Sequence, residues 1–263
     1  MGIDKDLETC GVYQDGPLKG QPIIRLDHRV PWRADAEIMI DFFDSLYRHC
    51  SSGFLHYRSF PFFLDDPNRR LFFDISNGFQ ELPGIIEAHQ QEGFKQGAFR
   101  HEYFFNQNLY AVPNHMEKDV ETVAAVQVDV DMAFDQKILE RMQPSIRVKT
   151  RTERYAWNRL DHFHFYWVLK KPIKPSLDYQ KVMLRLFHFF FKGWWYECTG
   201  YQLDARIPGT LNHALERVTF VESDFEYEFE FFDDFLPKLS IWDAAHYAHA
   251  YREMLIDPKK GIV

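Results

Sequence analysis

The hydrophobic and polar positions of this 263-residue chain follow two different periods, one helical and one strand-like. Apolar residues at helical spacing predict helices over 34–50, 78–93, 134–142, 177–197 and 241–255. Short apolar or alternating runs predict strands over 54–63, 101–112, 122–131, 146–152, 163–169, 217–222 and 225–232. Because strands and helices are interspersed, the pattern predicts an α/β or α+β fold with a sheet at its centre.

The domain organisation follows from the distribution of glycine, proline and charge. Residues 1–33 are rich in all three, and we expect them to form an irregular N-terminal arm. Residues 34–263 contain no internal repeat and no low-complexity linker. A segment of that length can bury a sizeable core, so we expect a single domain over 34–263.

Composition narrows the class of protein. Apolar residues make up 46% of the chain and charged residues 27%, which excludes collagen, coiled coil, disorder and a disulfide scaffold. The three cysteines, Cys10, Cys50 and Cys198, are too widely spaced for a zinc ribbon. The N-terminus carries no basic-then-apolar signal, and the apolar stretch 184–196 is too short to span a bilayer. We therefore expect a cytoplasmic, intracellular protein with no membrane partner.

Charge is distributed unevenly, which changes what the net charge of −8 implies. Segment 222–234 holds seven acidic residues and no basic ones, and we interpret its part 222–230 as a solvated strand face. Segment 141–174 holds nine basic residues against two acidic ones. Such a basic segment fits a phosphate-binding groove, with Arg147, Lys149 and Arg151 as candidate nucleic-acid contacts, and fits a solvated basic hairpin equally well.

Asp129 and Asp131 end an apolar alternating run, Ala-Ala-Val-Gln-Val-Asp-Val-Asp. Because side chains alternate between the two faces of a strand, both carboxylates are predicted to share one face, roughly 7 Å apart. Such a pair suits a hard divalent ion such as Mg²⁺ or Mn²⁺. A solvent-facing strand end with two incidental acids is the alternative interpretation.

Two further segments carry chemistry-bearing residues. His162 and His164 alternate with phenylalanines, so they share a strand face from which they can bind a metal, donate to a phosphate, or fill the edge of a core. Asp204 and Arg206 precede a Pro-Gly turn, and Asn212 follows it. This turn is either a plain loop or a source of a third metal ligand and of phosphate contacts.

In this order, the three segments resemble the motifs of the archaeo-eukaryotic primase superfamily, especially its plasmid and phage primase-polymerase branch. The family has a DxD or DxE metal motif on a strand, which 128–131 (VDVD) matches. A downstream small-x-His motif often continues as His-hydrophobic-Tyr-Trp, and 164–167 (HFYW) matches it. The third motif is an acid near R-hydrophobic-Pro-Gly-Thr-x-Asn, matched by 204–212 (DARIPGTLN). The resemblance covers about 103–221, a little under half of the chain.

The resemblance implies a fold and an activity. The implied fold is an RRM-like primase core with a mixed or antiparallel sheet flanked by helices, over 113–263, preceded by an N-terminal α/β unit over 34–112. The implied activity is that of a nucleotidyltransferase: a primer 3′-hydroxyl, or a first nucleotide, attacks the α-phosphate of an NTP or dNTP on a single-stranded DNA template and releases pyrophosphate.

The resemblance also assigns roles to residues. Asp129 and Asp131 would bind two catalytic Mg²⁺ or Mn²⁺ ions, with Asp204 as the third carboxylate. His164 would contact the phosphates of the incoming nucleotide, and Arg206 would add a second phosphate contact. His162 and Asn212 are further candidates for the nucleotide-binding site.

The sequence departs from the family pattern in several places. His162 stands where the family prefers Ser or Gly, and His213-Ala214-Leu215 stands where a basic residue commonly follows the Asn. The segment between Pro144 and His164 is longer and more basic than usual. The chain has no zinc module and no P-loop motif, so unwinding would come from a helicase supplied in trans or by a longer parent protein.

Two other classes of function remain open on the sequence. A replication or mobilisation endonuclease of the HUH type would use His162 and His164 as metal ligands and Tyr179 as a nucleophile that forms a phosphotyrosyl link to DNA. That interpretation leaves the Asp129–Asp131 pair and the 206–212 turn without a role. A catalytically silent nucleic-acid-binding module, with aromatic residues as stacking platforms, is the other class.

Overall fold

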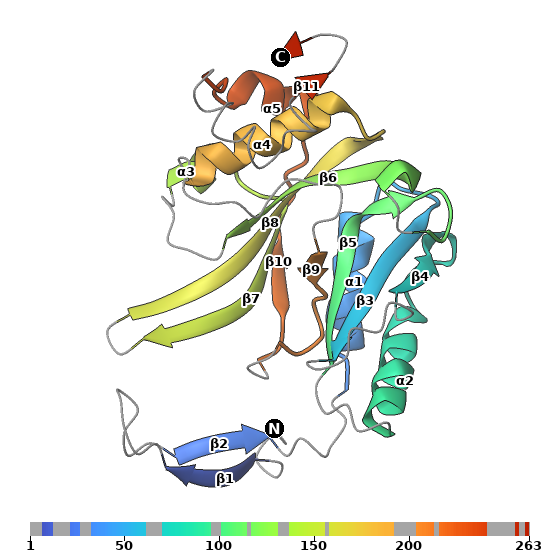
Figure 1. The fold of residues 1–263 in the computed structure, drawn as a ribbon, viewed down its shortest axis with the longest axis vertical. Helices are drawn as coiled ribbons and strands as arrows, with labels where there is room; N and C mark the ends of the chain where they lie inside the picture. Colours follow the sequence, from blue (N-terminus) through green and yellow to red (C-terminus); the bar gives the residue numbers. More distant parts are fainter. Residues whose placement is uncertain are drawn as a thin grey trace.

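The computed structural model describes residues 7–12, 22–26, 33–61, 70–95, 101–114, 117–130, 137–155, 158–191, 204–212, 216–240, 256–257 and 261–262. An eight-stranded sheet in the order β10-β7-β8-β6-β5-β3-β4 dominates the fold, with β9 paired to β5 (Figure 1). Its strands are β3 (Phe54–Pro61), β4 (Arg70–Asp74), β5 (His101–Tyr110), β6 (Val120–Val130), β7 (Ile146–Tyr155), β8 (Asn158–Ile173), β9 (Asp204–Arg206) and β10 (Thr219–Glu222). Every pairing in this sheet is antiparallel.

Helices flank the curled sheet (Figure 1). They are α1 (Ala36–Leu46), α2 (Leu82–Lys95), α3 (Lys137–Arg141), α4 (Leu177–Phe191) and α5 (Phe229–Phe235), with short 3₁₀ helices at Ile75–Asn77 and Glu117–Asp119. The predicted α/β class, with a central sheet flanked by helices, is therefore confirmed, and the sheet is antiparallel. Among the described residues, no helix is long and apolar enough to cross a membrane.

Outside this sheet, two short antiparallel sheets pair β1 (Leu7–Val12) with β2 (Pro22–Leu26) and β11 (Ile256–Asp257) with β12 (Gly261–Ile262). Part of the arm that was expected to be irregular thus has paired strands. The predicted division between 34–112 and 113–263 falls between β5 and β6, which are neighbours in the large sheet. Strands of both predicted units therefore share one sheet, while the division itself stays a prediction.

The strand predicted over 225–232 is wrong, because α5 begins at Phe229. Alternating Phe and Glu residues suggested a strand with one apolar face. In the structure Phe232 is fully buried, and the rings of Phe231 and Phe235, one helical turn apart, stack with centroids 5.2 Å apart. Tertiary packing against α4 and β8 thus overrides the local period of two. The helix predicted over 241–255 lies outside the described residues.

Two hydrophobic cores form, one on each face of the sheet. On one face, Met39, Phe42 and Phe43 of α1 pack with strand residues such as Phe105 and Tyr166. On the other face, α3, α4 and α5 cover the valines of β6 together with Phe165 and Trp167 of β8. Residues that belong to one core or the other therefore show toward which face the side chains of each strand point.

The Pro-Gly turn after β9 is fastened to the start of α1. The carbonyl of Gly209 accepts a hydrogen bond from the backbone N–H of Asp35 (2.9 Å), and the Asp35 carboxylate in turn accepts one from the N–H of Ile38 (3.2 Å) as the N-cap of α1. Gly209 has φ +84°, and a Cβ placed there would lie 2.5 Å from the Asp35 carbonyl oxygen. Only glycine fits this position without moving backbone.

We expect Gly209→Ala to lower the free energy of unfolding by about 2 kcal/mol, because the substitution adds a positive-φ penalty to a backbone collision. Urea denaturation followed by circular dichroism measures the loss. Gly84→Ala is the matched control, because a Cβ at Gly84 in α2 meets no atom within 4 Å. Alanine should leave stability unchanged or raise it there. Equal losses in the two variants would contradict this account of the turn.

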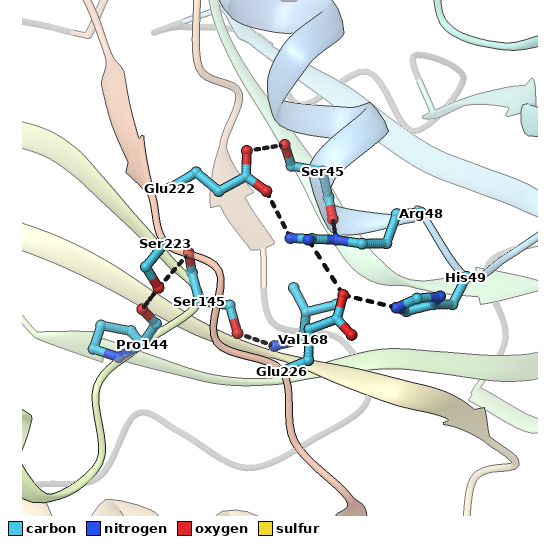
Figure 2. A network of polar contacts seen from close by, with 9 residues as sticks. All are labelled: Ser45, Arg48, His49, Pro144, Ser145, Val168, Glu222, Ser223 and Glu226. Carbon is cyan, nitrogen blue, oxygen red and sulfur yellow. Dashed lines mark hydrogen bonds and ion pairs between the residues drawn. The ribbon is translucent and has the colours of Figure 1, made fainter.

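Part of the acidic segment 222–234 anchors α1 to the sheet (Figure 2). Arg48 lies 2.7 Å from Glu222 and 3.2 Å from Glu226, and His49 lies 2.9 Å from Glu226. The Ser45 hydroxyl donates to Glu222 at 2.6 Å. These contacts join the end of α1 to β10 and to the segment that follows it. Glu222 and Glu226 are therefore ion-paired, not merely solvated as the sequence suggested.

Arg48→Ala removes two of these ion pairs at once, so we expect it to lower the free energy of unfolding by about 1 kcal/mol at low salt. The loss should shrink as NaCl is raised, because the side chains are partly exposed and therefore screened. Lys170→Ala serves as the control: Lys170 lies 3.9 Å from Glu228 and both side chains are about half exposed. That variant should stay within about 0.5 kcal/mol of wild type. A salt-independent Arg48 effect would argue against the ion pairs.

Candidate active site

The pairing of β6 with β8 places Asp129 directly opposite His164. Val128, Val130 and Phe165 point into the core under α4, so Asp129 and His164 project from the other face of their strands. His164 Nε2 lies 3.2 Å from Asp129 Oδ1, with 5% of the histidine side chain and 35% of the aspartate side chain exposed. The candidate site therefore contains a buried imidazole, that of His164, in contact with the partly exposed carboxylate of Asp129.

Arg151 joins this pair because of an irregularity in β7. The register between β7 and β8 shifts between Lys149 and Arg151, so Arg151 pairs with His162. Arg151 therefore shares a face with His162 and His164, whereas Lys149 pairs with Phe163 on the opposite face. We name Asp129, Arg151, His162 and His164 the Asp129 cluster.

The electrostatics of the Asp129 cluster favour an ionised aspartate. Burial raises the pKa of Asp129, but the nearby His164, His162 and Arg151 more than offset that effect, so the pKa lies below its usual value. A carboxylate of this kind is a chemically suitable ligand for a hard divalent cation.

The other predicted metal ligands lie elsewhere or outside the described residues. Asp131, the second aspartate of the motif, is not among the residues that the structure describes. Within the described ranges, no three His, Cys, Asp or Glu side chains gather as a metal site. The carboxylate of Asp129 is suited to bind a cation. Metal binding at Asp129, Asp131 and Asp204 stays a prediction.

Asp204 and Arg206 lie in a second group of charged side chains, on β9. Ala205 and Ile207 point into the core with α1, so Asp204 and Arg206 project from the opposite face of their strand. Asp204 forms an ion pair with Arg58 of β3, and Arg206 forms one with Glu102 of β5. The Arg206 guanidinium also lies 4.9 Å from the ring centroid of Phe104. We name Arg58, Glu102, Phe104, Asp204 and Arg206 the Asp204 cluster.

Arg58 and Glu102 were missed by the sequence analysis. Each is a lone charged residue in an apolar strand, and its partner lies about a hundred or more positions away in the chain. Strand alternation alone predicts the face of each residue. Only the strand order, with β5 between β3 and β9, places Arg58 within reach of Asp204.

Asn212 holds the Pro-Gly turn against β7. It is 2% exposed, and its side-chain amide donates to the Thr150 carbonyl at 2.8 Å, where the β7 register shifts. The side-chain oxygen of Asn212 accepts from the N–H of Glu216 at 2.9 Å. Asn212 therefore positions the backbone that presents Arg151, and its predicted contact with a nucleotide stays a prediction.

The two other basic residues predicted to contact nucleic acid lie away from the Asp129 cluster. The Arg147 guanidinium lies 5.8 Å from the centroid of the Phe165 ring, and Lys149 is ion-paired with Asp161 at 3.2 Å. Both belong to the face of the sheet that carries α4. The three bases therefore do not form one stripe, because the irregularity in β7 turns Arg151 to the other side.

Tyr179 is a core residue. It belongs to α4, is 1% exposed and packs into the core between α4 and the sheet, where its hydroxyl accepts a hydrogen bond from the Gln107 amide at 3.1 Å. His162 and His164 point from the opposite face of β8. The sheet thus separates the tyrosine from the histidine pair that an HUH-type mechanism would combine with it.

Comparison with known proteins gives similarity in structure only. No protein-family model matches the sequence, and no curated protein matches it. The fold is similar to the AEP domain of the cyanophage S-2L primase-polymerase, with a TM-score of 0.55 at 15% identity over 78% of this chain and 100% of that domain.

Two structures of the primase RepB′ are similar at lower scores. The catalytic domain in complex with initiator DNA has a TM-score of 0.44 at 9% identity, over 82% of this chain and 98% of that chain. The other RepB′ structure has a TM-score of 0.35 at 8% identity, over 82% of this chain and 63% of that chain. On the similarity to the cyanophage domain, the chain has an archaeo-eukaryotic primase-like fold.

Proposed function

We propose that this chain is the catalytic domain of a primase-polymerase, which synthesises or extends a primer on a single-stranded DNA template from NTPs or dNTPs. The observation that carries the proposal is the contact between Asp129 and His164 at 3.2 Å on paired strands of a primase-like fold. An ionised carboxylate can hold a divalent cation, and an imidazole beside it can donate a hydrogen bond to a phosphate.

In this proposal, Asp129 and Asp131 hold Mg²⁺ or Mn²⁺, whereas Asp204 projects from the opposite face of its strand in an ion pair with Arg58. Bound there, the ions would neutralise the negative charge that develops on the phosphates during transfer. His164, fixed by Asp129, donates a hydrogen bond to a phosphate of the incoming nucleotide, and Arg151 adds positive charge on the same face. The primer 3′-hydroxyl oxygen bonds to the α-phosphorus as the bond to the pyrophosphate oxygen breaks, and the hydroxyl proton leaves to solvent.

The HUH-type endonuclease has no comparable support. Its nucleophile would be Tyr179, which belongs to α4, is 1% exposed and points into the core on the other side of the sheet from the histidine pair. A phosphotyrosyl link needs the hydroxyl within reach of a metal-bound phosphate. A helicase, in trans or in a longer parent protein, remains a proposed partner.

We expect wild type to incorporate labelled nucleotides on single-stranded DNA with Mg²⁺ or Mn²⁺, and Asp129→Asn to lose at least about 100-fold of that activity. The assay is run with and without a primer, and circular dichroism checks that each variant is folded. Asp161→Asn is the matched control: Asp161 lies on β8 three residues before His164, pairs with Lys149, and points to the opposite face. It should retain activity.

Other outcomes would overturn the proposal. Equal activity in wild type and Asp129→Asn would remove Asp129 from the mechanism. Cleaved DNA attached covalently to Tyr179 would establish the HUH-type endonuclease. DNA binding without synthesis or cleavage under any of these conditions would establish a binding module.

A further inference from the structure

Strand β10 leaves one edge of the large sheet open. It is the last strand in the order of the sheet, and within the described residues no strand pairs with its outer side (Figure 1). The N–H of Ser223 donates to the Ser145 carbonyl at 2.8 Å, next to the register pair of Glu222 and Ile146. Because hydrogen-bonded residues alternate along an antiparallel strand, the backbone groups of Phe220 and Glu222 point outward. The sheet can therefore accept a further strand at this edge.

A groove runs between this edge and α1. Its volume is about 710 Å³. One wall is a flank of α1 that extends from Glu37 to Arg48, and the other wall is formed by Thr219, Phe220 and Glu222 of β10. An extended segment that pairs with β10 would thus lie against one side of the helix.

Two contacts bound the groove along its length. At the start of α1, the N–H of Asp35 donates to the Gly209 carbonyl at 2.9 Å, and at its end Arg48 lies 2.7 Å from Glu222 (Figure 2). The outer side of Val218 is already occupied, because this residue exchanges two backbone hydrogen bonds with the Pro-Gly turn. The open strand has four residues. It spans roughly 13 Å at about 3.3 Å per residue, which matches a short extended peptide.

The α1 wall of the groove is acidic. Glu37, Asp41 and Asp44 follow one another along the flank at spacings of four and three residues, which places them in one row. Arg48, the basic residue among the described residues of the lining, is already paired with Glu222. Burial and the nearby charge of Asp41 raise the pKa of Asp44. Within the described ranges these acids do not gather as a metal site. The wall therefore favours a cationic partner and repels the phosphates of a nucleic acid.

The two faces of β10 differ in polarity. Phe220 packs against the core with α1, and the Glu222 side chain points to the same side. Val221 points to the other face and is 69% exposed. In an added strand, every second side chain would therefore meet the acids of α1, and the side chains between them would lie beside Val221. The matching segment alternates basic and apolar residues.

We propose that the β10 edge and the acidic flank of α1 bind an extended segment of a partner protein in which basic residues alternate with apolar ones. The segment adds as an antiparallel strand, as β10 itself adds to β7. Its backbone exchanges hydrogen bonds with Phe220 and Glu222, and its basic side chains reach the acids of α1. This site is separate from the Asp129 cluster and does not rest on the proposed function.

The probe is the capped heptapeptide TRVRVRT, labelled for fluorescence anisotropy. Opposite residues of an antiparallel pair share a face, so the arginines oppose Phe220 and Glu222 and turn their N–H groups toward β10. N-methylation of the three arginines removes these donors and should weaken binding at least about ten-fold. The matched control carries N-methyl groups on both valines and the last threonine, whose N–H groups point away from β10, and should bind like the unmodified peptide.

Charge is tested on the protein side. Asp41→Asn/Asp44→Asn removes two negative charges from the groove, and we expect at least about five-fold weaker binding of the unmodified peptide at low salt. The difference should shrink as NaCl is raised, because the groove is open to solvent. Asp178→Asn/Glu228→Gln is the matched control. It removes two acids whose side chains are 76% and 48% exposed outside the groove, and it should bind like wild type.

Other results would overturn the proposal. Equal affinities of the two methylated peptides would indicate charge attraction without an added strand. Unchanged affinity in Asp41→Asn/Asp44→Asn, or an equal loss in its control variant, would remove the acids of α1 from the site. Failure of the unmodified peptide to bind would mean that the acids only protect an edge strand from pairing. A dimer in sedimentation velocity that excludes the peptide would assign the edge to a second copy of the chain.

Discussion

The antiparallel register between β6 and β8 is the constraint on which the candidate site depends. A slip of one residue would exchange the two faces of a strand, and Asp129 would then point into the core under α4. Val128 and Val130 on β6, with Phe165 and Trp167 on β8, prevent that slip because they are buried under the helices. The same apolar residues that stabilise the fold therefore fix Asp129 opposite His164.

The irregularity in β7 then determines which basic side chains lie on the same face of the sheet as Asp129. A uniform β7 strand would place Arg147, Lys149 and Arg151 on one face, and that face carries α4. The register shift after Lys149 turns Arg151 toward Asp129, and Asn212 holds the Thr150 carbonyl at that point. Because Gly209 also fastens the same turn to α1, the segment 207–212 links the helix to the strand beside the site.

Local patterns in the sequence predict the face of a strand on which a residue lies, but they do not predict the order of the strands in the sheet. Alternation predicted that His162 and His164 share a face and that Asp129 points away from the neighbouring valines, since both depend only on the period of a strand. The ion pair between Arg58 and Asp204 depends on strand order, which alternation does not encode. The strand predicted over 225–232 failed because stacking of Phe231 on Phe235 and burial of Phe232 favour a helix.

The acidic and the basic segments of the sequence are both partly neutralised by ion pairs in the folded chain. The acidic segment after residue 221 contributes Glu222 and Glu226 to an anchor for Arg48 and His49, so part of its charge is neutralised structurally. Part of the basic segment is neutralised as well, since Lys149 pairs with Asp161. Arg151 faces Asp129, whereas Arg58 and Arg206 project from the opposite face of the sheet, where Asp204 and Glu102 hold them in ion pairs. The charge that surrounds Asp129 is therefore determined by strand register, which turns Arg151 toward it, and not by the run of basic residues in the sequence.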